Sequence, residues 1–269
     1  MGLLKRFFNT NPLPPAATVA EERLLPCPVC AAPCASLDWV DFNKNCEGSQ
    51  GPKLGNSGIL VEYVLCDDCG FCFAPEFARW TFRDFEQRIY NEDYELVDPE
   101  YKKVRPEGNA EMLHQLLGSA RINHLDYGGG SGLLSDRLRE KGWNSRTYDP
   151  FVQRQVNLKD LGTFDLVTSF EVFEHVPDID SLFSNLMGLV KADGLIFFST
   201  LLSDGEIARG RPLTWWYAAP RNGHITLFSA KSLRSSLGKR GFQLASANAN
   251  LHLAYRSVPA WARHLLPAA

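Results

Sequence analysis

The sequence predicts an α/β protein whose mostly parallel sheet is covered by helices on both faces, preceded by a small N-terminal metal-binding module. In the C-terminal half, short apolar runs of strand length alternate with amphipathic helical stretches. A glycine-rich loop stands at one strand-to-helix junction, at residues 128–132. All seven cysteines fall between Cys27 and Cys72. These three observations define a two-part chain.

The composition divides the chain into four segments. Residues 1–22 are rich in proline and alanine and are expected to form a tail and linker. A cysteine-rich, glycine-punctuated module follows at 23–80, and a helical connector at 81–118. The remaining residues, 119–269, carry the alternating pattern and form the α/β domain.

Within this pattern, each apolar run is assigned to a strand and each amphipathic stretch to a helix. Strands are expected at 122–127, 144–149, 164–170, 195–202, 243–249 and 251–258. Helices are expected at 111–117, 131–142, 178–194 and 229–241.

Charge and hydropathy exclude several classes of protein. A net charge of −3 provides no general attraction to nucleic acid or to anionic lipid. No apolar run approaches the roughly 18 residues of a membrane-spanning helix, so no stable membrane insertion is expected. The opening MGLLKRFFNT is too short in its apolar part for a secretory signal. The expected location is the cytoplasm.

Two CxxC pairs, CPVC and CDDCG, provide four thiolates suited to a tetrahedral zinc ion: Cys27, Cys30, Cys66 and Cys69. Gly70 suits the tight turn that such a knuckle requires. A closed site with four cysteines has no open position, so its role is structural or in substrate docking. Cys34, Cys46 and Cys72 remain, either as buried filler or, for Cys34 and Cys72, as substitute ligands.

The segment LDYGGGSG allows the backbone to approach a ligand closely at Gly128, Gly130 and Gly132. A carboxylate ends the next strand at Asp149, where it is placed to accept hydrogen bonds from ribose hydroxyls. The Walker pattern is absent, and the nicotinamide fingerprint would require glycine where Leu133 stands. The pattern is DxGxGxG, and its first residue is Asp126.

This pattern resembles motif I of the class I S-adenosylmethionine-dependent methyltransferases. The resemblance continues through YDP, FDLVTSFEVFEHV, KADGLIFFST and RNGHITLFSAKSLRSSLGKRGF, over roughly residues 110–250. It implies a seven-stranded Rossmann-like methyltransferase sheet that binds S-adenosyl-L-methionine. In this family Asp126 and the three glycines would border the amino-acid end of the cofactor, and Asp149 would hold the ribose.

One departure from the family concerns the crossover after Asp149. Phe164 follows Asp149 by only 15 positions, where the family fits a helix, a strand and another helix. The third strand is therefore expected to be short or missing. The adenine contacts are assigned to Asp160 or Leu161.

The segment EVFEH follows the strand at 164–170 and places ionisable groups at Glu171, Glu174 and His175. Ligands bind beyond the carboxyl ends of parallel strands, so Glu171 is expected to face the cofactor and to take part in catalysis. In one interpretation Glu174 and His175 only orient this loop. In the other, Glu171, Glu174 and His175 join the distant His224 around a divalent ion.

The second interpretation rests on a resemblance to the metal-assisted 2′-O-methyltransferases of small RNAs and to the ubiquinone-pathway O-methyltransferases. It implies an ion that engages substrate hydroxyls, with Mg²⁺, Mn, Fe, Co and Zn all compatible with carboxylate and imidazole ligands. Without an ion, His224 is the best general base, because neutral imidazole accepts a proton near pH 7.

The segment TWWYAAPRNGH is expected to form the substrate side of the cleft. Trp215, Trp216 and Tyr217 would cover a planar or sugar ring, and Arg221 would hold an anionic group. The alternative is an aromatic lid that packs on the core.

Together these features imply methylation of a small-molecule or glycan-type acceptor, on oxygen rather than on carbon or nitrogen. One alternative is an RNA methyltransferase with a zinc-ribbon-like docking module, but acids in CDDC and NEDYELVDPE oppose phosphate binding. CxxCGFxF with IYNEDY also resembles the N-terminal zinc part of tailoring methyltransferases, including sugar C-methyltransferases. A non-catalytic module that binds S-adenosylmethionine or a protein is the third alternative.

Overall fold

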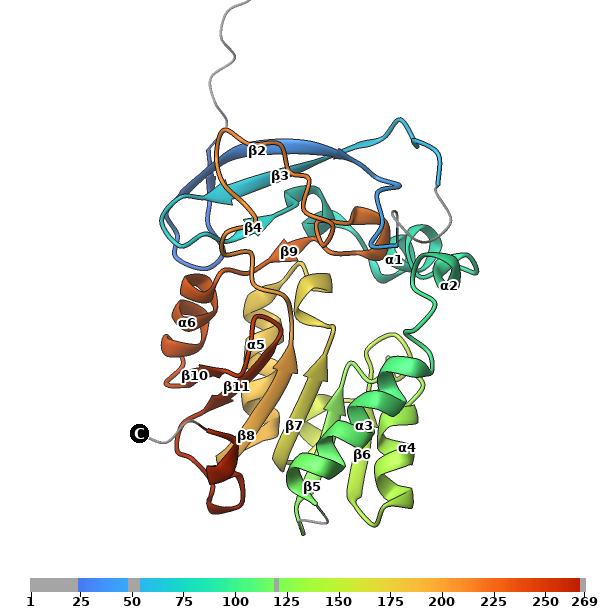
Figure 1. Ribbon diagram of the computed structural model, residues 1–269, viewed down its shortest axis with the longest axis vertical. Coiled ribbons are helices and arrows are strands. Elements are labelled where there is room, and N and C mark those ends of the chain that lie inside the picture. Colours follow the sequence, from blue (N-terminus) through green and yellow to red (C-terminus); the bar gives the residue numbers. More distant parts are fainter. Residues whose placement is uncertain (1–23, 48–53, 119–120, 267–269) are drawn as a thin grey trace, which may run out of the picture.

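The computed structural model describes residues 24–47, 54–118 and 121–266 and contains two β-sheets (Figure 1). The tail and linker expected at 1–22 lie outside the described residues. The N-terminal sheet lies across one end of the second, larger sheet (Figure 1). The predicted site residues Glu174, His175 and His224 lie at the boundary between the two sheets.

The N-terminal sheet has five antiparallel strands: β1 (Leu25–Pro26), β2 (Pro33–Asp41), β3 (Leu60–Cys66), β4 (Cys72–Phe73) and β9 (Thr226–Leu227). β9 comes from far along the chain and pairs with β4, with Cys72 opposite Leu227. The cysteine module is therefore completed by a strand that begins two residues after His224. That strand lies within the range 119–269 predicted for the α/β domain.

A helical connector joins the two sheets, and it begins at Pro75, before the range 81–118 expected for it. It consists of η1 (Pro75–Arg79), α1 (Phe82–Arg88), α2 (Tyr94–Val97) and α3 (Val104–Leu117). α1 begins at a capping box in which Thr81 Oγ1 accepts from the Asp84 backbone N–H, while the Asp84 carboxylate accepts from the Thr81 backbone.

The second sheet confirms the predicted α/β alternation. Its order is β10 (Gln243–Ser246), β11 (Leu251–Tyr255), β8 (Val190–Ser199), β7 (Phe164–Phe170), β5 (Asn123–Tyr127) and β6 (Asn144–Tyr148). The last four are parallel, and β11 is antiparallel to both of its neighbours. Six strands stand where the family resemblance implied seven. Residues 150–163 contain only the short η2 (Leu158–Leu161), so the crossover is abbreviated and the third strand is absent there.

Helices cover both faces of this sheet. α3 and α4 (Leu133–Glu140) pack on the face that carries Leu166, and α5 (Ile179–Leu189) and α6 (Ala230–Gly238) on the face that carries Val167 (Figure 1). The helix predicted over 178–194 ends at Leu189. Val190 already pairs with Phe164 of β7, so the backbone has entered β8 and the helix does not continue.

The two sheets share one hydrophobic core. Cys27 and Cys69 of the N-terminal module lie in the same buried cluster as Val167 of β7, Ile196 of β8 and Leu237 of α6. The sheets therefore cannot separate without exposing apolar surface to water. Among the described residues, no helix is long and apolar enough to cross a membrane.

Candidate active site and metal centre

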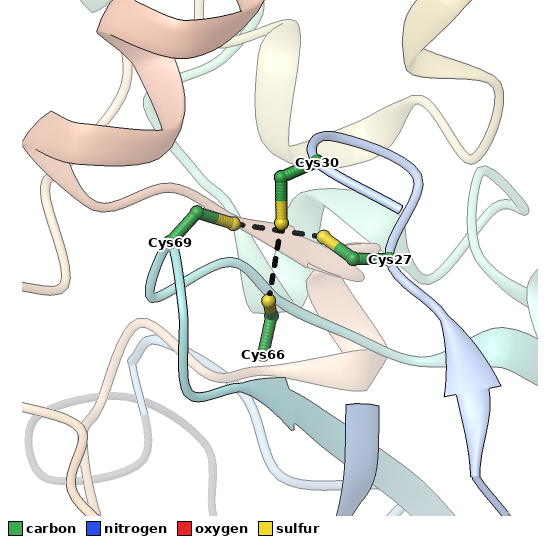
Figure 2. A group of neighbouring side chains, drawn as sticks. All are labelled: Cys27, Cys30, Cys66 and Cys69. Atoms are coloured by element: carbon green, nitrogen blue, oxygen red, sulfur yellow. Dashed lines mark hydrogen bonds between the residues drawn. The ribbon is translucent and has the colours of Figure 1, made fainter. Parts of the chain in front are cut away.

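The four predicted zinc ligands come together. Their sulfur atoms all lie within 4.8 Å of one another, with Cys27 Sγ 3.5 Å from Cys69 Sγ and Cys30 Sγ 3.4 Å from Cys66 Sγ (Figure 2). Thiolates bound to one tetrahedral zinc ion at about 2.3 Å are separated by just under 4 Å, so this arrangement fits zinc.

The two knuckles have the same backbone form. In each, the residue after the second cysteine is left-handed, Ala31 at φ 64° and Gly70 at φ 72°, and its N–H donates to the carbonyl of the first cysteine. Gly70 adopts this conformation without strain, whereas Ala31 does not. The sequence indicated the turn at Gly70 but gave no signal for the matching turn at Ala31.

The second knuckle also docks on the start of α6. Ser229, the N-cap of that helix, donates its hydroxyl to the Cys69 carbonyl at 2.5 Å. A Cβ atom on Gly70 would lie 2.9 Å from Ser229 Oγ, so glycine is needed for this close approach as well as for its φ angle.

The remaining cysteines differ in position. Cys34 and Cys72 are fully buried, as filler residues would be. Cys46 instead lies with its Sγ 3.6 Å from Nδ1 of His224, and burial raises the pKa of its thiol. The expectation that all three are filler or substitute ligands therefore misses the contact made by Cys46.

The glycine loop connects β5 to α4 as predicted. Gly128, Gly130 and Gly132 all have positive φ, at 78°, 54° and 89°, a region in which glycine is free of Cβ strain. The Gly130 N–H donates to Asp149 Oδ2 at 3.0 Å, and Asp149 Oδ1 accepts from the Phe151 N–H at 2.8 Å. The carboxylate at the end of β6 therefore holds the loop in place.

Asp126 lies beneath this loop and is buried. Its Oδ1 accepts the Thr168 hydroxyl at 2.8 Å, and a Cβ atom on Gly129 would overlap its carboxylate. Burial, reinforced by the charge of Asp149, raises the pKa of Asp126 to about 7. The structure thus gives Asp126 a supporting position under the predicted cofactor loop.

Glu171 directly follows β7 and has an unusual backbone. Its φ of 53° lies in the left-handed region, which is strained for a glutamate. Ser199, at the end of β8, holds it there: the Glu171 N–H donates to Ser199 Oγ at 2.8 Å, and Ser199 Oγ donates to Glu171 Oε1 at 2.7 Å. The carboxylate is therefore fixed at the carboxyl ends of two parallel strands.

The segment after Glu171 packs directly on the glycine loop. A Cβ atom on Gly128 would lie 2.5 Å from Cγ2 of Val172, so only glycine allows this contact. The EVFEH segment is therefore a wall of the predicted cofactor site, as expected from its place after β7.

Glu174 and His175 lie in the short η3 (Phe173–His175) and meet His224 across the boundary between the sheets. One ligand atom from each of the three lies within 4.8 Å of the other two. Glu171 does not belong to this group, so the structure assembles three of the four residues in the predicted set. One carboxylate with two imidazoles suits borderline metals, whereas Mg²⁺ prefers oxygen ligands. The expectation of Mg²⁺ is not supported.

Burial shifts the pKa of all three groups toward their neutral forms. The pKa of Glu174 is raised well above its usual range by burial and by the charge of Glu171. The pKa of His175 falls to about 3, and that of His224 falls well below its usual range, mainly through burial, with Arg105 adding repulsion. Neither oxygen of Glu174 finds a hydrogen-bond partner within the described part of the chain.

His224 is held from three directions. Its Nδ1 lies 2.9 Å from the Tyr217 carbonyl, which can only accept, so Nδ1 carries the proton and Nε2 keeps a lone pair. The Tyr63 hydroxyl donates to the His224 carbonyl at 2.6 Å, and the Tyr217 ring lies 4.2 Å from the imidazole, centroid to centroid.

The aromatic loop is largely core. Trp215 and Tyr217 are buried, and Trp216 is half exposed. Arg221, in η4 (Pro220–Asn222), is also buried and donates to the Ile89 carbonyl at 2.8 Å and to Asn91 Oδ1 at 3.0 Å. Trp215 and Tyr217 thus pack on the core, which agrees with the alternative interpretation of this segment as an aromatic lid.

Two residues of the connector reach the site without having been predicted. The Tyr90 ring lies 6.2 Å from the His175 ring and 5.2 Å from the ring of Phe151, which follows Asp149 by two positions. Arg105 forms a partly buried ion pair with Asp98. The aromatic segment IYNEDY was the only sequence signal for this part of the site.

A cavity of about 650 Å³ lies beside the end of the glycine loop. Its lining includes Gly132, Thr147, Asp160 and Leu161. The residues predicted to contact adenine are therefore gathered on the same side of the sheet as the glycine loop.

Comparison with known proteins identifies the family. Residues 101–247, more than half of the chain, match the family model described as a methyltransferase domain. The ubiquinone biosynthesis O-methyltransferase of Colwellia psychrerythraea is 36% identical over 100 residues, covering 29% of this chain and 41% of that protein. The enzyme of the same name from Coxiella burnetii is 30% identical over 130 residues, covering 36% and 55%. The chain thus spans about half the length of these relatives.

Solved structures align less closely. The 1,6-didemethyltoxoflavin-N1-methyltransferase of Burkholderia thailandensis aligns with a TM-score of 0.47 and 18% identity, over 76% of this chain and 96% of that one. The magnesium protoporphyrin IX methyltransferase of Synechocystis PCC 6803 aligns with a TM-score of 0.42 and 18% identity, over 68% and 95%.

Proposed function

This chain belongs to the methyltransferase domain family, that of the class I S-adenosylmethionine-dependent methyltransferases, and we propose that it methylates a hydroxyl oxygen of a small-molecule or glycan-type acceptor. The observation that carries the proposal is the position of His224. Its ring lies against the ring of His175. His175 belongs to the EVFEH segment, whose Val172 packs directly on Gly128 of the glycine loop.

The cofactor site follows from the residues around this loop. Gly128, Gly130 and Gly132 leave the backbone open to the amino-acid end of S-adenosylmethionine, and Glu171 stands at the adjoining strand end. Asp149 Oδ2 accepts one backbone N–H and keeps a lone pair for a ribose hydroxyl, while Oδ1 already accepts from the N–H groups of Phe151 and Val152. Asp160 and Leu161 would border adenine. The named enzymes among the relatives, which are O-methyltransferases, support the choice of oxygen.

His224 would act as the general base. When bound, S-adenosylmethionine supplies the methyl group: the acceptor oxygen bonds to the methyl carbon as the carbon–sulfur bond breaks, which releases S-adenosylhomocysteine. The hydroxyl proton passes to Nε2 of His224, which has a lone pair because Nδ1 donates to Tyr217. The low pKa of His224 keeps this nitrogen unprotonated at neutral pH.

The first test replaces His224 by alanine and separates binding from transfer. With S-adenosylmethionine labelled in its methyl group, we expect the wild-type protein to label acceptors in a deproteinised small-molecule or glycan extract of bacterial cells. His224→Ala should lower that labelling by about 100-fold or more, since general-base catalysis typically contributes that much. Calorimetry should show cofactor affinity within about threefold of wild type. Equal labelling by both proteins would remove His224 from the mechanism.

The cluster of Glu174, His175 and His224 also fits a divalent ion of borderline softness. The two Glu174 oxygens, which lack hydrogen-bond partners in the described part of the chain, and two neutral imidazoles form a donor set that such an ion would complete once Glu174 gives up its proton. The ion would also lower the pKa of an acceptor hydroxyl. Chelation followed by addition of single metals tests this mechanism. If labelling survives chelation, His224 alone removes the proton. If chelation abolishes labelling and one transition metal restores it, the ion assists proton removal.

A further inference from the structure

A second large cavity lies on the far side of the connector from the glycine loop, and the function proposed above does not use it. Its volume is about 790 Å³, and it lies between the end of β2, the start of β3, α1 and α2. The described residues that line it include Phe42, Trp80, Gln87, Asn91 and Arg221.

Aromatic rings form one side of this cavity. The Trp80 and Phe42 ring centroids are 6.2 Å apart and the planes are tilted by 41°. The Arg88 guanidinium carbon lies 5.3 Å from the Trp80 ring centroid. An aromatic face offers a flat apolar surface to a ligand whose own ring presents C–H groups.

The rest of the cavity is lined by positively and negatively charged side chains and by hydrogen-bond donors and acceptors. Two cations, Arg88 and Arg221, stand with two acids, Glu76 and Asp93, and no ion pair joins any of these four in the described part of the chain. The charges of the described lining residues therefore balance, and this lining offers donors and acceptors together, as does the Gln87 amide. Hydroxyl groups, each a donor and an acceptor, match such a lining better than a phosphate or an ammonium group does.

The cavity shares a wall with the candidate active site. Arg221 lines the cavity and precedes His224 by three positions. On the facing segment, Asn91 lines the cavity and accepts from Arg221, while the adjacent Tyr90 places its ring 6.2 Å from that of His175. The cavity therefore lies next to the two segments that also carry groups of the candidate active site.

We propose that this cavity is a saccharide subsite, which binds a sugar ring of the acceptor other than the one that is methylated. The inference rests on the function proposed above and narrows its acceptor class to an oligosaccharide or glycoconjugate. Trp80 and Phe42 provide the apolar surface, and the side chains of Gln87, Glu76, Asp93 and Arg88 bind the hydroxyl groups, since Arg221 and Asn91 already bond to one another.

The experiment applies the full-length protein, without cofactor, to an array of immobilised oligosaccharides and follows each hit by Trp fluorescence with the free oligosaccharide. The variants are Trp80→Leu and Gln87→Ala; Gln87 is exposed on α1, so its replacement leaves folding intact. Arg83→Ala is the control, since Arg83 is exposed on the same helix but does not line the cavity. Cofactor affinity is measured separately for every protein by calorimetry.

We expect the wild type and Arg83→Ala to bind the same oligosaccharides, and Trp80→Leu and Gln87→Ala to bind them about tenfold more weakly, or about 1.4 kcal/mol. All four should bind S-adenosylmethionine equally. The absence of any oligosaccharide binding, undiminished binding by both variants, or a response to free nucleotides alone would overturn the subsite. Loss of S-adenosylmethionine binding by the wild type would instead refute the proposed function, whatever the array shows.

Discussion

Single buried residues decide how the parallel sheet responds to pH, and His124 is the clearest case. It lies fully buried in β5, with Nδ1 2.7 Å from Ser145 Oγ and Nε2 2.9 Å from Thr168 Oγ1. Burial lowers the pKa of His124 from about 6.5 to about 3. The folded protein therefore keeps this imidazole neutral where the unfolded chain would protonate it.

The expected consequence is a stability difference that depends on pH. Between pH 6.5 and pH 3 the unfolded state binds a proton at His124 that the folded state does not bind. The contribution of the neutral, buried His124 to the unfolding free energy is therefore complete above pH 6.5 and is lost as the pH falls toward 3. His124→Asn removes this titration. The difference in unfolding free energy between wild type and variant should shrink by up to about 1.4 kcal/mol for each pH unit below 6.5. Urea unfolding of both proteins at pH 7, 5.5 and 4.5 measures it, and a constant difference would contradict the assignment.

At the scale of elements, the segment that carries His224 belongs to the N-terminal sheet more than to the sheet it follows in sequence. Lys44 Nζ donates to the Trp215 carbonyl at 2.7 Å, and the Cys46 N–H donates to Asn222 Oδ1 at 2.9 Å. Immediately after His224, β9 pairs with β4. The cysteine module thus positions the proposed catalytic base.

Tyr63→Phe tests this positioning by removing one hydrogen bond. The Tyr63 hydroxyl, buried in β3, donates to the His224 carbonyl, so its loss should lower the unfolding free energy by about 1–3 kcal/mol. It should also shift the His224 imidazole signals in an NMR spectrum of histidine-labelled protein, assigned with His224→Ala. Cofactor affinity should stay unchanged.

Tyr101→Phe is the control for this change, because the half-buried Tyr101 hydroxyl makes no hydrogen bond within the described ranges. Its stability and its histidine spectrum should equal those of the wild type. Unshifted His224 signals in Tyr63→Phe would show that the module does not position this residue.

For the whole molecule, the shared core makes the four predicted zinc ligands part of the same folded unit as the parallel sheet rather than an attached module. Cys27 and Cys69 lie in one buried cluster with Phe173 and Phe228. Phe173 directly precedes Glu174 of the candidate site. Loss of zinc would leave buried thiols without their partner and loosen the core on which β9 and η3 rest.

We therefore expect one zinc ion per chain by elemental mass spectrometry, and its loss in Cys27→Ser. That variant should unfold at a lower temperature and lose methyl transfer, yet retain cofactor affinity within about tenfold, because the glycine loop lies in the other sheet. Cys72→Ala is the control: Cys72 is buried in β4 but lies outside the four-sulfur group, so zinc should be retained. Zinc-free wild-type protein with full stability would contradict the site.

The sequence was informative wherever the chemistry is local. The glycine loop, the carboxylate at Asp149 and the paired CxxC knuckles each depend on a few neighbouring residues, and the structure assembles them as predicted. It was less informative for aromatic residues, since Trp215 and Tyr217 have the composition of a substrate lid but are buried. The end of α5 was also missed, because a bulge at the start of β8 depends on pairing with β7.

By itself, then, the sequence determined the α/β alternation, the glycine loop and the two CxxC pairs, because turns, periodicity and motif spacing are set by residues near one another in the chain. Only the tertiary structure decided which distant groups meet. It joined His224 to Glu174 and His175, left Glu171 bound to Ser199, and added β9 to the N-terminal sheet. These contacts depend on how two sheets pack into one core, which no local pattern specifies.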